Sequence, residues 1–130
     1  MNKRSSGFTV VEILIIISVL AAASILFFVQ KNNISTTFRD DKRKTSINAM
    51  YYSLEEIYYK TNEYYPATID EKILPSVDPD LFTDPSGNKL GSAKSDYRYE
   101  PTNCQDNKCS SYSLRANLEN EDDFVKSNKD

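Results

Sequence analysis

A long apolar segment near the start of this 130-residue chain constrains the fold more than any other feature. Residues 8–29 are twenty-two in number, and their only ionisable side chain is that of Glu12. At a helical rise of 1.5 Å per residue they would extend about 33 Å, which is the thickness of the hydrocarbon core of a bilayer. The sequence therefore predicts a membrane-spanning helix, and the first thirty or so residues cannot belong to a soluble core.

The residues before this segment predict its orientation. Lys3 and Arg4 stand immediately ahead of the apolar run. Because basic flanking residues are retained on the cytoplasmic side, the N-terminus is expected in the cytoplasm and the residues after Val29 outside. The predicted location is the cytoplasmic membrane, with a single pass.

Two ordinary interpretations of this segment stay open. In the first, it is a cleaved secretory signal, since "AAAS" at residues 21–24 supplies a small-residue cleavage pattern. However, "ILFFV" continues the apolar run beyond that point. In the second, it is a plain single-pass anchor. Neither interpretation explains Glu12, whose unpaired charge is costly to bury in an apolar environment.

The opening motif has a more specific resemblance. A short basic leader ends in Gly7, Phe8 follows, and Glu12 comes four residues later at the head of the long apolar helix. This pattern resembles the class III signal of type IV pilins and pseudopilins. In that family a membrane aspartyl peptidase cuts after the glycine and methylates the new N-terminal phenylalanine. The resemblance implies a leader of residues 1–7, cleavage between Gly7 and Phe8, and N-methylation of Phe8.

The same resemblance implies a function in assembly. It predicts a structural subunit, a prepilin, that polymerises through its N-terminal helix into an extracellular type IV pilus for motility, adhesion or DNA uptake. The implied partners are further copies of the chain, minor pilins, the prepilin peptidase, the assembly motor and platform proteins, and the membrane. In the filament, Glu12 would pair with the amino group of Phe8 on a neighbouring subunit, which offsets the cost of burying both charges. Alternatives are a pseudopilin of a type II secretion-like system and an anchored binding domain that never assembles.

The helix is predicted to continue beyond the membrane as an amphipathic segment. Apolar residues recur at spacings of three and four, and charged residues occupy the opposite face. A bend or frayed stretch is expected near residues 31–37, and Asn62 and Pro66 end the helix. The predicted regions are residues 8–30 for the spanning half, 31–62 for the amphipathic half and 63–130 for the head. The apolar stripe is Ile47, Met50, Tyr51, Leu54, Ile57 and Tyr58, and the polar face carries Arg39, Lys44, Glu55 and Lys60.

The head is predicted to complete an α+β fold. Residues 68–74 are expected to form one or two helical turns, and "DPSGN" at residues 84–88 is interpreted as a surface turn. Three extended candidates follow, namely "DYRYEP", "SYSLRANL" and "DFVKS". About three antiparallel strands would then pack on the C-terminal half of the long helix.

The two cysteines, Cys104 and Cys109, are predicted to form a disulfide. An extracytoplasmic location favours oxidation, and four intervening residues suit a closed turn between two strands. Chain-entropy arithmetic for so short a loop gives about 2 kcal/mol. A metal site is a poorer interpretation, because the chain has no histidine and no second cysteine pair. Redox catalysis would call for two intervening residues.

Composition argues against several functional classes. The formal net charge is −3, or −5 without Lys3 and Arg4, and a negative charge disfavours binding to nucleic acid. No sequence-specific nucleic-acid partner is predicted. Without histidine the ordinary base for a nucleophile is missing, so we expect neither an enzyme nor a cofactor. Calcium is conceivable at hard oxygen donors, but solvated surface charge is the favoured interpretation and no metal site is predicted. The oxygen donors considered are those of Asp84, Asn120, Asp122 and Asp123.

Overall fold

The computed structural model describes residues 7–129, and the basic leader residues Lys3 and Arg4 lie outside the described part. Helix α1 (Val10–Ser53) continues into a π-helical turn, η1 (Leu54–Tyr58), and a last turn, α2 (Tyr59–Asn62). The predicted end at Asn62 is confirmed. The frayed stretch expected near residues 31–37 is wrong, because the backbone there is helical throughout, and the bend expected there stays a prediction. The chain divides into two compact units, the second of which begins at Thr36.

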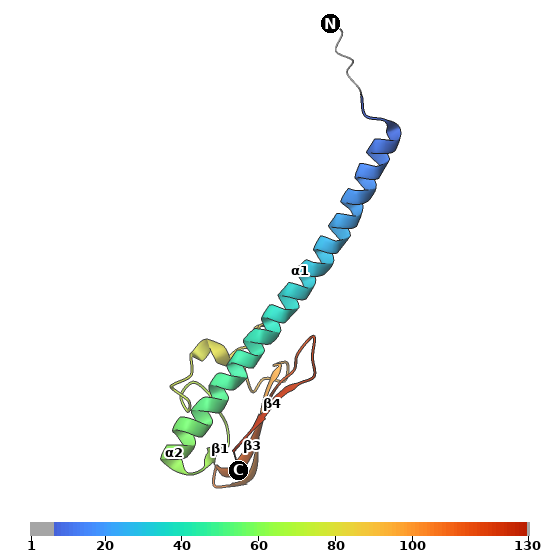
Figure 1. Cartoon of the computed structure of the whole chain (residues 1–130). Helices are drawn as coiled ribbons and strands as arrows, with labels where there is room; N and C mark the ends of the chain where they lie inside the picture. Colours follow the sequence, from blue (N-terminus) through green and yellow to red (C-terminus); the bar gives the residue numbers. More distant parts are fainter. Residues whose placement is uncertain (1–6, 130) are drawn as a thin grey trace. The chain divides into compact units, whose positions relative to one another are not determined.

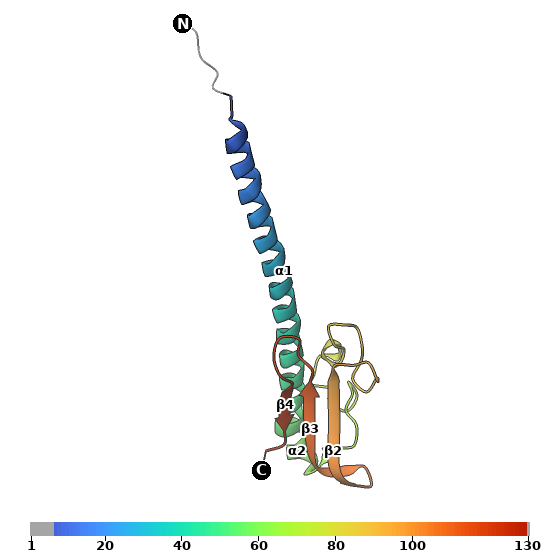
Figure 2. The ribbon, with the colours of Figure 1, turned by 90° about the vertical axis from the view of Figure 1, so that its right-hand side faces the viewer.

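The second unit contains one antiparallel sheet. Its strands are β1 (Tyr65–Pro66), β2 (Tyr97–Gln105), β3 (Lys108–Ala116) and β4 (Phe124–Ser127). Strand β3 is central: it pairs with β2 on one edge, and with β1 and β4 at opposite ends of its other edge. Figure 2 shows β2, β3 and β4 side by side. The α+β prediction is confirmed, with one additional strand, β1, whose two residues are too few to produce an alternating pattern.

The sheet packs against the C-terminal half of α1, beside which it is drawn in Figure 1. Inward-facing residues of β3 alternate with outward-facing ones, as the period of a half-buried strand requires. The helix contributes the predicted stripe positions Ile47, Met50 and Leu54, all fully buried. The core therefore joins one helix face to one sheet face. Its buried apolar residues from the sheet and the connecting segments are Tyr65, Ile69, Leu74, Val77, Phe82, Tyr97, Cys109, Tyr112, Leu114 and Ala116.

The predicted stripe fails at its C-terminal end. Ile57 was expected in the core and is 52% exposed, whereas Glu55 was expected on the polar face and is 5% exposed. The cause is the π-helical turn over Leu54–Tyr58, which adds a residue to one turn and rotates all that follows. Spacing rules for a regular α-helix cannot anticipate this rotation.

The segment after the helix contains a single helical turn fastened by an aspartate side chain. Of the one or two turns predicted over residues 68–74, one forms: the Leu74 N–H donates to the Asp70 carbonyl at 2.9 Å, and the Asp70 carboxylate accepts the N–H groups of Lys72 and Ile73. Pro75 follows Leu74 directly and disfavours helical backbone at that residue. A short 3-10 helix, η2 (Pro79–Phe82), comes next.

The "DPSGN" loop is organised from inside. Asp84 is buried, and its carboxylate accepts the N–H groups of Ser86, Asn88 and Asp96 at 2.8–2.9 Å. Gly87 has φ +87°, a conformation that side chains rarely adopt. The interpretation as a simple surface turn is therefore corrected: Pro85 and Gly87 shape the turn, but Asp84 fastens it to the start of β2.

Candidate functional site: the exposed apolar helix and its Glu12

The N-terminal part of α1 carries a continuous apolar surface. Every large apolar side chain described from residue 8 to residue 29 is about half exposed or more. Soluble monomers rarely expose so large an apolar area, and this helix is long and apolar enough to cross a membrane. The surface therefore requires cover from lipid or from other protein. The residues concerned are Phe8, Val10, Val11, Ile13, Leu14, Ile15, Ile16, Ile17, Val19, Leu20, Ile25, Leu26, Phe27, Phe28 and Val29.

Glu12 closes a capping box at the start of α1. Its Oε2 atom accepts the Thr9 N–H at 2.8 Å and the Thr9 hydroxyl at 3.0 Å, while the Glu12 N–H donates to Thr9 Oγ1 at 3.3 Å. This reciprocal arrangement satisfies helix N-terminal N–H groups that would otherwise lack partners. Sequence reasoning missed it, although the signal is present: Thr-x-x-Glu before an apolar run is the capping-box pattern.

The capping box determines where the Glu12 carboxylate lies. It sits in the first helical turn, where the helix dipole favours negative charge. Because its backbone donor is the N–H of Thr9, the carboxylate is next to the peptide bond that follows Phe8. The structure thus gathers Phe8, Thr9 and Glu12 at one end of α1. The predicted pairing of Glu12 with Phe8 of another subunit involves a second chain and stays a prediction.

Gly7 has no structural requirement to be glycine in the described chain. It precedes the helix, and a Cβ built on it would meet no heavy atom within 4 Å. Its φ lies outside the positive range, unlike those of Gly87 and Gly91. The fold would accept a larger residue at position 7, so any need for glycine there must come from something other than packing.

Polar and small residues within the apolar segment are compatible with lipid. The hydroxyls of Ser18 and Ser24 donate to the carbonyls of Leu14 and Leu20, each at 2.8 Å. Neither hydroxyl therefore needs a partner from outside the helix. The small residues at positions 21–24 would let neighbouring helices approach closely.

A buried ionic cluster fastens the second unit together. Arg43, 3% exposed, donates to Asp40 at 2.9 Å, to Asp96 at 2.9 Å and to Glu119 at 2.9 Å. Arg39 binds Glu119 through its Nε and Nη2 atoms at 2.6 and 2.5 Å. These bonds connect α1, the start of β2 and the β3–β4 loop. The sequence predicted Arg39 on a polar face. The burial of Arg43 was not predicted, because a charged residue in an amphipathic helix is expected to be exposed to solvent.

Asp40 is the second buried member of this cluster. Its carboxylate accepts the N–H of Glu119 at 2.9 and 3.1 Å and the N–H of Asn120 at 3.0 Å. Burial alone raises the pKa of Asp40, but these two N–H groups and Arg43 outweigh it and lower the pKa. Hydrogen bonds from Arg39 and Arg43 lower the pKa of Glu119 to about 2. Both acids therefore remain charged throughout the physiological range.

Glu55 forms a second buried polar group. Its carboxylate accepts the hydroxyl of Tyr112 at 2.7 Å and that of Tyr65 at 3.1 and 3.2 Å. Burial, with Glu55 as a further cause, raises the pKa of both tyrosines. The π-helical turn places this carboxylate between helix and sheet, where it joins β1 and β3 to α1.

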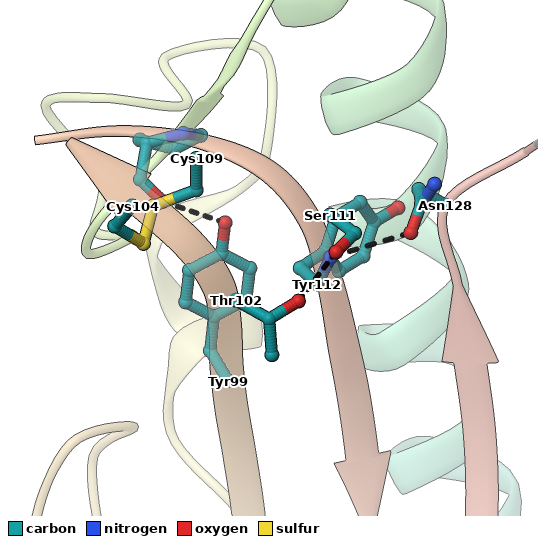
Figure 3. Close-up of a disulfide and its surroundings, with 8 residues drawn as sticks. Tyr99, Thr102, Cys104, Cys109, Ser111, Tyr112 and Asn128 are labelled. Carbon is teal, nitrogen blue, oxygen red and sulfur yellow. Dashed lines mark hydrogen bonds between the residues drawn. A yellow bond between two sulfur atoms is a disulfide. The ribbon is translucent and has the colours of Figure 1, made fainter.

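The predicted disulfide is confirmed. Cys104 and Cys109 are bonded across the β2–β3 hairpin, with Cα atoms 3.9 Å apart (Figure 3). Asp106 and Asn107 form the tip with φ of +50° and +62°, which are the values of the tight turn that matches strand twist. The disulfide is a local cross-link between the C-terminal end of β2 and the N-terminal end of β3.

The four oxygen donors considered for calcium do not form a group. Asp84 uses its carboxylate on backbone N–H groups, and the Asn120 side chain donates to Thr36. Within residues 7–129, no cluster of three or more His, Cys, Asp or Glu residues is arranged to hold a metal.

Comparison with protein-family models, with curated proteins and with solved structures finds no match to this chain.

Proposed function

We propose that this chain is a prepilin-like structural subunit. It is cut between Gly7 and Phe8, methylated on Phe8, and polymerised through residues 8–29 into an extracellular filament. The observation that carries the proposal is the exposed apolar helix with a single carboxylate, Glu12, in its first turn. Such a helix needs either lipid or neighbouring helices around it. Assembly would withdraw the helix from the lipid and surround it with the helices of other subunits in the filament core.

Three further observations support this function. Gly7 precedes the helix, and packing does not require glycine there. A residue recognised by a peptidase would have this property. Glu12 lies beside the position at which cleavage creates a new amino group, so a cation and an anion come within reach of one another at a subunit contact. The compact second unit begins at Thr36, after the apolar segment, and would form the outer layer of the fibre.

The proposed life cycle follows from these parts. The precursor spans the cytoplasmic membrane with its N-terminus in the cytoplasm, and a prepilin peptidase removes the leader there. An assembly motor and platform protein then extract the helix into a filament of further copies and minor subunits. Motility, adhesion and DNA uptake are uses of such a fibre. A secretion pseudopilin would employ the same chemistry in a shorter fibre.

The test is the intact mass of the chain extracted from membranes, compared between wild type and Gly7→Val. The proposal predicts loss of residues 1–7 and gain of one methyl group in the wild type, and an uncut chain in the variant. Val10→Ala, beyond the cut, serves as the control and should be processed normally. A wild-type chain that retains its leader, or one cut after Ala23, would refute the proposal.

A further inference from the structure

Arg98 differs from the other arginines of the described chain in having no acidic partner. Arg39, Arg43 and Arg115 each form at least one ion pair with a carboxylate. Within residues 7–129, no carboxylate forms an ion pair with Arg98, and the groups that accept its hydrogen bonds are backbone carbonyls. A guanidinium is always charged, so this position carries an uncompensated cation.

The guanidinium of Arg98 is held in place. Its Nη1 atom donates to the carbonyls of Ser95 at 2.6 Å, Tyr97 at 3.0 Å and Ser92 at 3.4 Å, and its Nη2 atom donates to that of Ala93 at 3.0 Å. These bonds fix the side chain over the loop that leads into β2. The ordering of a long side chain, which normally weakens a surface ion pair, is therefore already accomplished.

One edge of this guanidinium keeps its donors. Arginine has five N–H groups, and the Nε hydrogen and one Nη2 hydrogen of Arg98 remain after the bonds to the loop. The Nε and Nη2 atoms are also the pair with which Arg39 holds the two oxygens of Glu119 and Arg43 holds Asp96. Arg98 thus keeps a donor on each of the two atoms that this protein uses twice elsewhere to bind a carboxylate.

The nearest cross-strand neighbour of Arg98 is a second arginine whose charge is paired. Arg115 lies directly opposite it on β3, so the two side chains share one face of the sheet. Like charges at directly opposed positions destabilise a sheet unless each is neutralised. Arg115 has Glu100 and Asp123 within 3.6 and 3.9 Å. Within residues 7–129 no carboxylate forms such a pair with Arg98.

A cleft of about 480 Å³ adjoins Arg98 at the free edge of β2. Its walls include the apolar side chains of Ile69, Leu90 and Tyr99 and the hydroxyl residues Thr68 and Ser92. The lining combines apolar and polar surface, and the volume lies in the range of small-molecule sites. Arg98 is itself one of the residues that line this cleft.

We infer that this cleft binds a small organic acid: a carboxylate held by Nε and Nη2 of Arg98, attached to an apolar body that enters the cleft. This inference is independent of the proposed assembly function, because the site lies within the second unit. The carboxylate supplies the missing counter-charge, and the apolar walls distinguish such a ligand from a bare inorganic anion.

The test uses the ¹⁵N-labelled full chain in micelles of a non-ionic detergent and follows the arginine Nε–Hε signals by NMR. Sodium phenylacetate is the probe, and phenylacetamide is its neutral counterpart of the same shape. We expect a saturable shift of the Arg98 signal with phenylacetate, and at least tenfold weaker binding of phenylacetamide. Inorganic phosphate should also bind at least tenfold more weakly, because it lacks the apolar body.

Two variants complete the experiment. Arg98→Lys keeps the charge but removes the two-pronged edge, so phenylacetate should bind at least fivefold more weakly, as read from backbone amide signals of the cleft. Arg115→Lys, directly opposite on the same face, is the matched control and should bind as the wild type does. Equal affinity for acid and amide in the wild type, a phosphate affinity equal to that of phenylacetate, or no saturable shift would each overturn the inference, irrespective of how the variants fold.

Discussion

Replacement of Asp40 by asparagine should strongly destabilise the second unit. The Asp40 carboxylate is 2% exposed and accepts from three donors: the Glu119 N–H, shared between its two oxygens, the Asn120 N–H and Arg43. An asparagine side chain has a single acceptor oxygen, and its amide hydrogens would face the remaining donors. The variant leaves at least one buried donor unpaired and removes the counter-charge of the buried Arg43.

The expected cost is about 3 kcal/mol, at the lower end of the range for breaking a buried ion pair. For a unit of this size, that cost corresponds to a fall in melting temperature of roughly 12–24 °C. The assay is thermal unfolding at pH 7, followed by circular dichroism on the fragment of residues 36–130. That fragment retains Thr36 and Arg39, which contact the β3–β4 loop. We expect it to be soluble and monomeric, because it lacks the exposed apolar segment.

Asp41 provides the matched control for this experiment. It is the next residue along the helix and is exposed. Asp41→Asn removes the same charge without removing a buried acceptor, so its melting temperature should remain close to that of the wild type. A change below about 1 kcal/mol for Asp40→Asn, or equal changes for the two variants, would show that the buried cluster does not hold the loop to the helix.

Three further outcomes are expected of the same fragment. Glu55→Ala should cost about 2 kcal/mol because it leaves two buried tyrosine hydroxyls unpaired, whereas Glu56→Ala at an exposed position should cost less; equal unfolding midpoints in urea would contradict this. Side-chain hydrogen bonds from Arg39 lower the pKa of Glu119, and those from Lys129 lower the pKa of Glu56, each from 4.5 to about 2. The stabilisation from these two groups is complete above pH 4.5 and is lost as the pH falls toward 2, so the unfolding free energy should decline over that window, and a flat profile in an acid titration would contradict the assignment. Reduction of the disulfide should lower the unfolding free energy by only about 2 kcal/mol, and complete unfolding in a thiol reductant would show that it is more than a local staple.

Hydrophobic periodicity predicted the long helix and the core strands because those features follow directly from backbone geometry. Ile47, Met50 and Leu54 repeat at helical spacing, and Tyr112, Leu114 and Ala116 alternate at strand spacing; all six are buried. These patterns required no knowledge of tertiary contacts.

The errors begin where tertiary contacts outweigh local pattern. Glu55 is buried because a π-helical turn directs it to two tyrosine hydroxyls on β1 and β3, and no local signal in the helix sequence marks that turn. Arg43 and Asp40 are buried because carboxylates and N–H groups some 50 to 80 residues away reach them. A sequence of alternating charges does not indicate which of its members will find such partners.

At the candidate site, the residues were identified from sequence, but one contact was not. Gly7, Phe8 and Glu12 were singled out by their spacing and by the single charge in an apolar run. The bond between Glu12 and Thr9 was overlooked, although the capping-box pattern is local and could have been read. The intramolecular contact gives Glu12 a role in the isolated subunit, so its contribution to assembly has to be separated by experiment from its contribution to the helix start.

The most direct test of the central claim is the amount of this chain in filaments sheared from the cell surface, compared between wild type, Glu12→Ala and Thr9→Val. Both variants lose hydrogen bonds of the capping box, but only Glu12→Ala removes the charge. With leader cleavage confirmed by mass in all three, the account predicts abundant wild-type filaments, a nearly normal amount for Thr9→Val, and none for Glu12→Ala. Normal filaments from Glu12→Ala would contradict the pairing of Glu12 with the amino group of Phe8, and the absence of this chain from the wild-type sheared fraction would contradict the filament function itself.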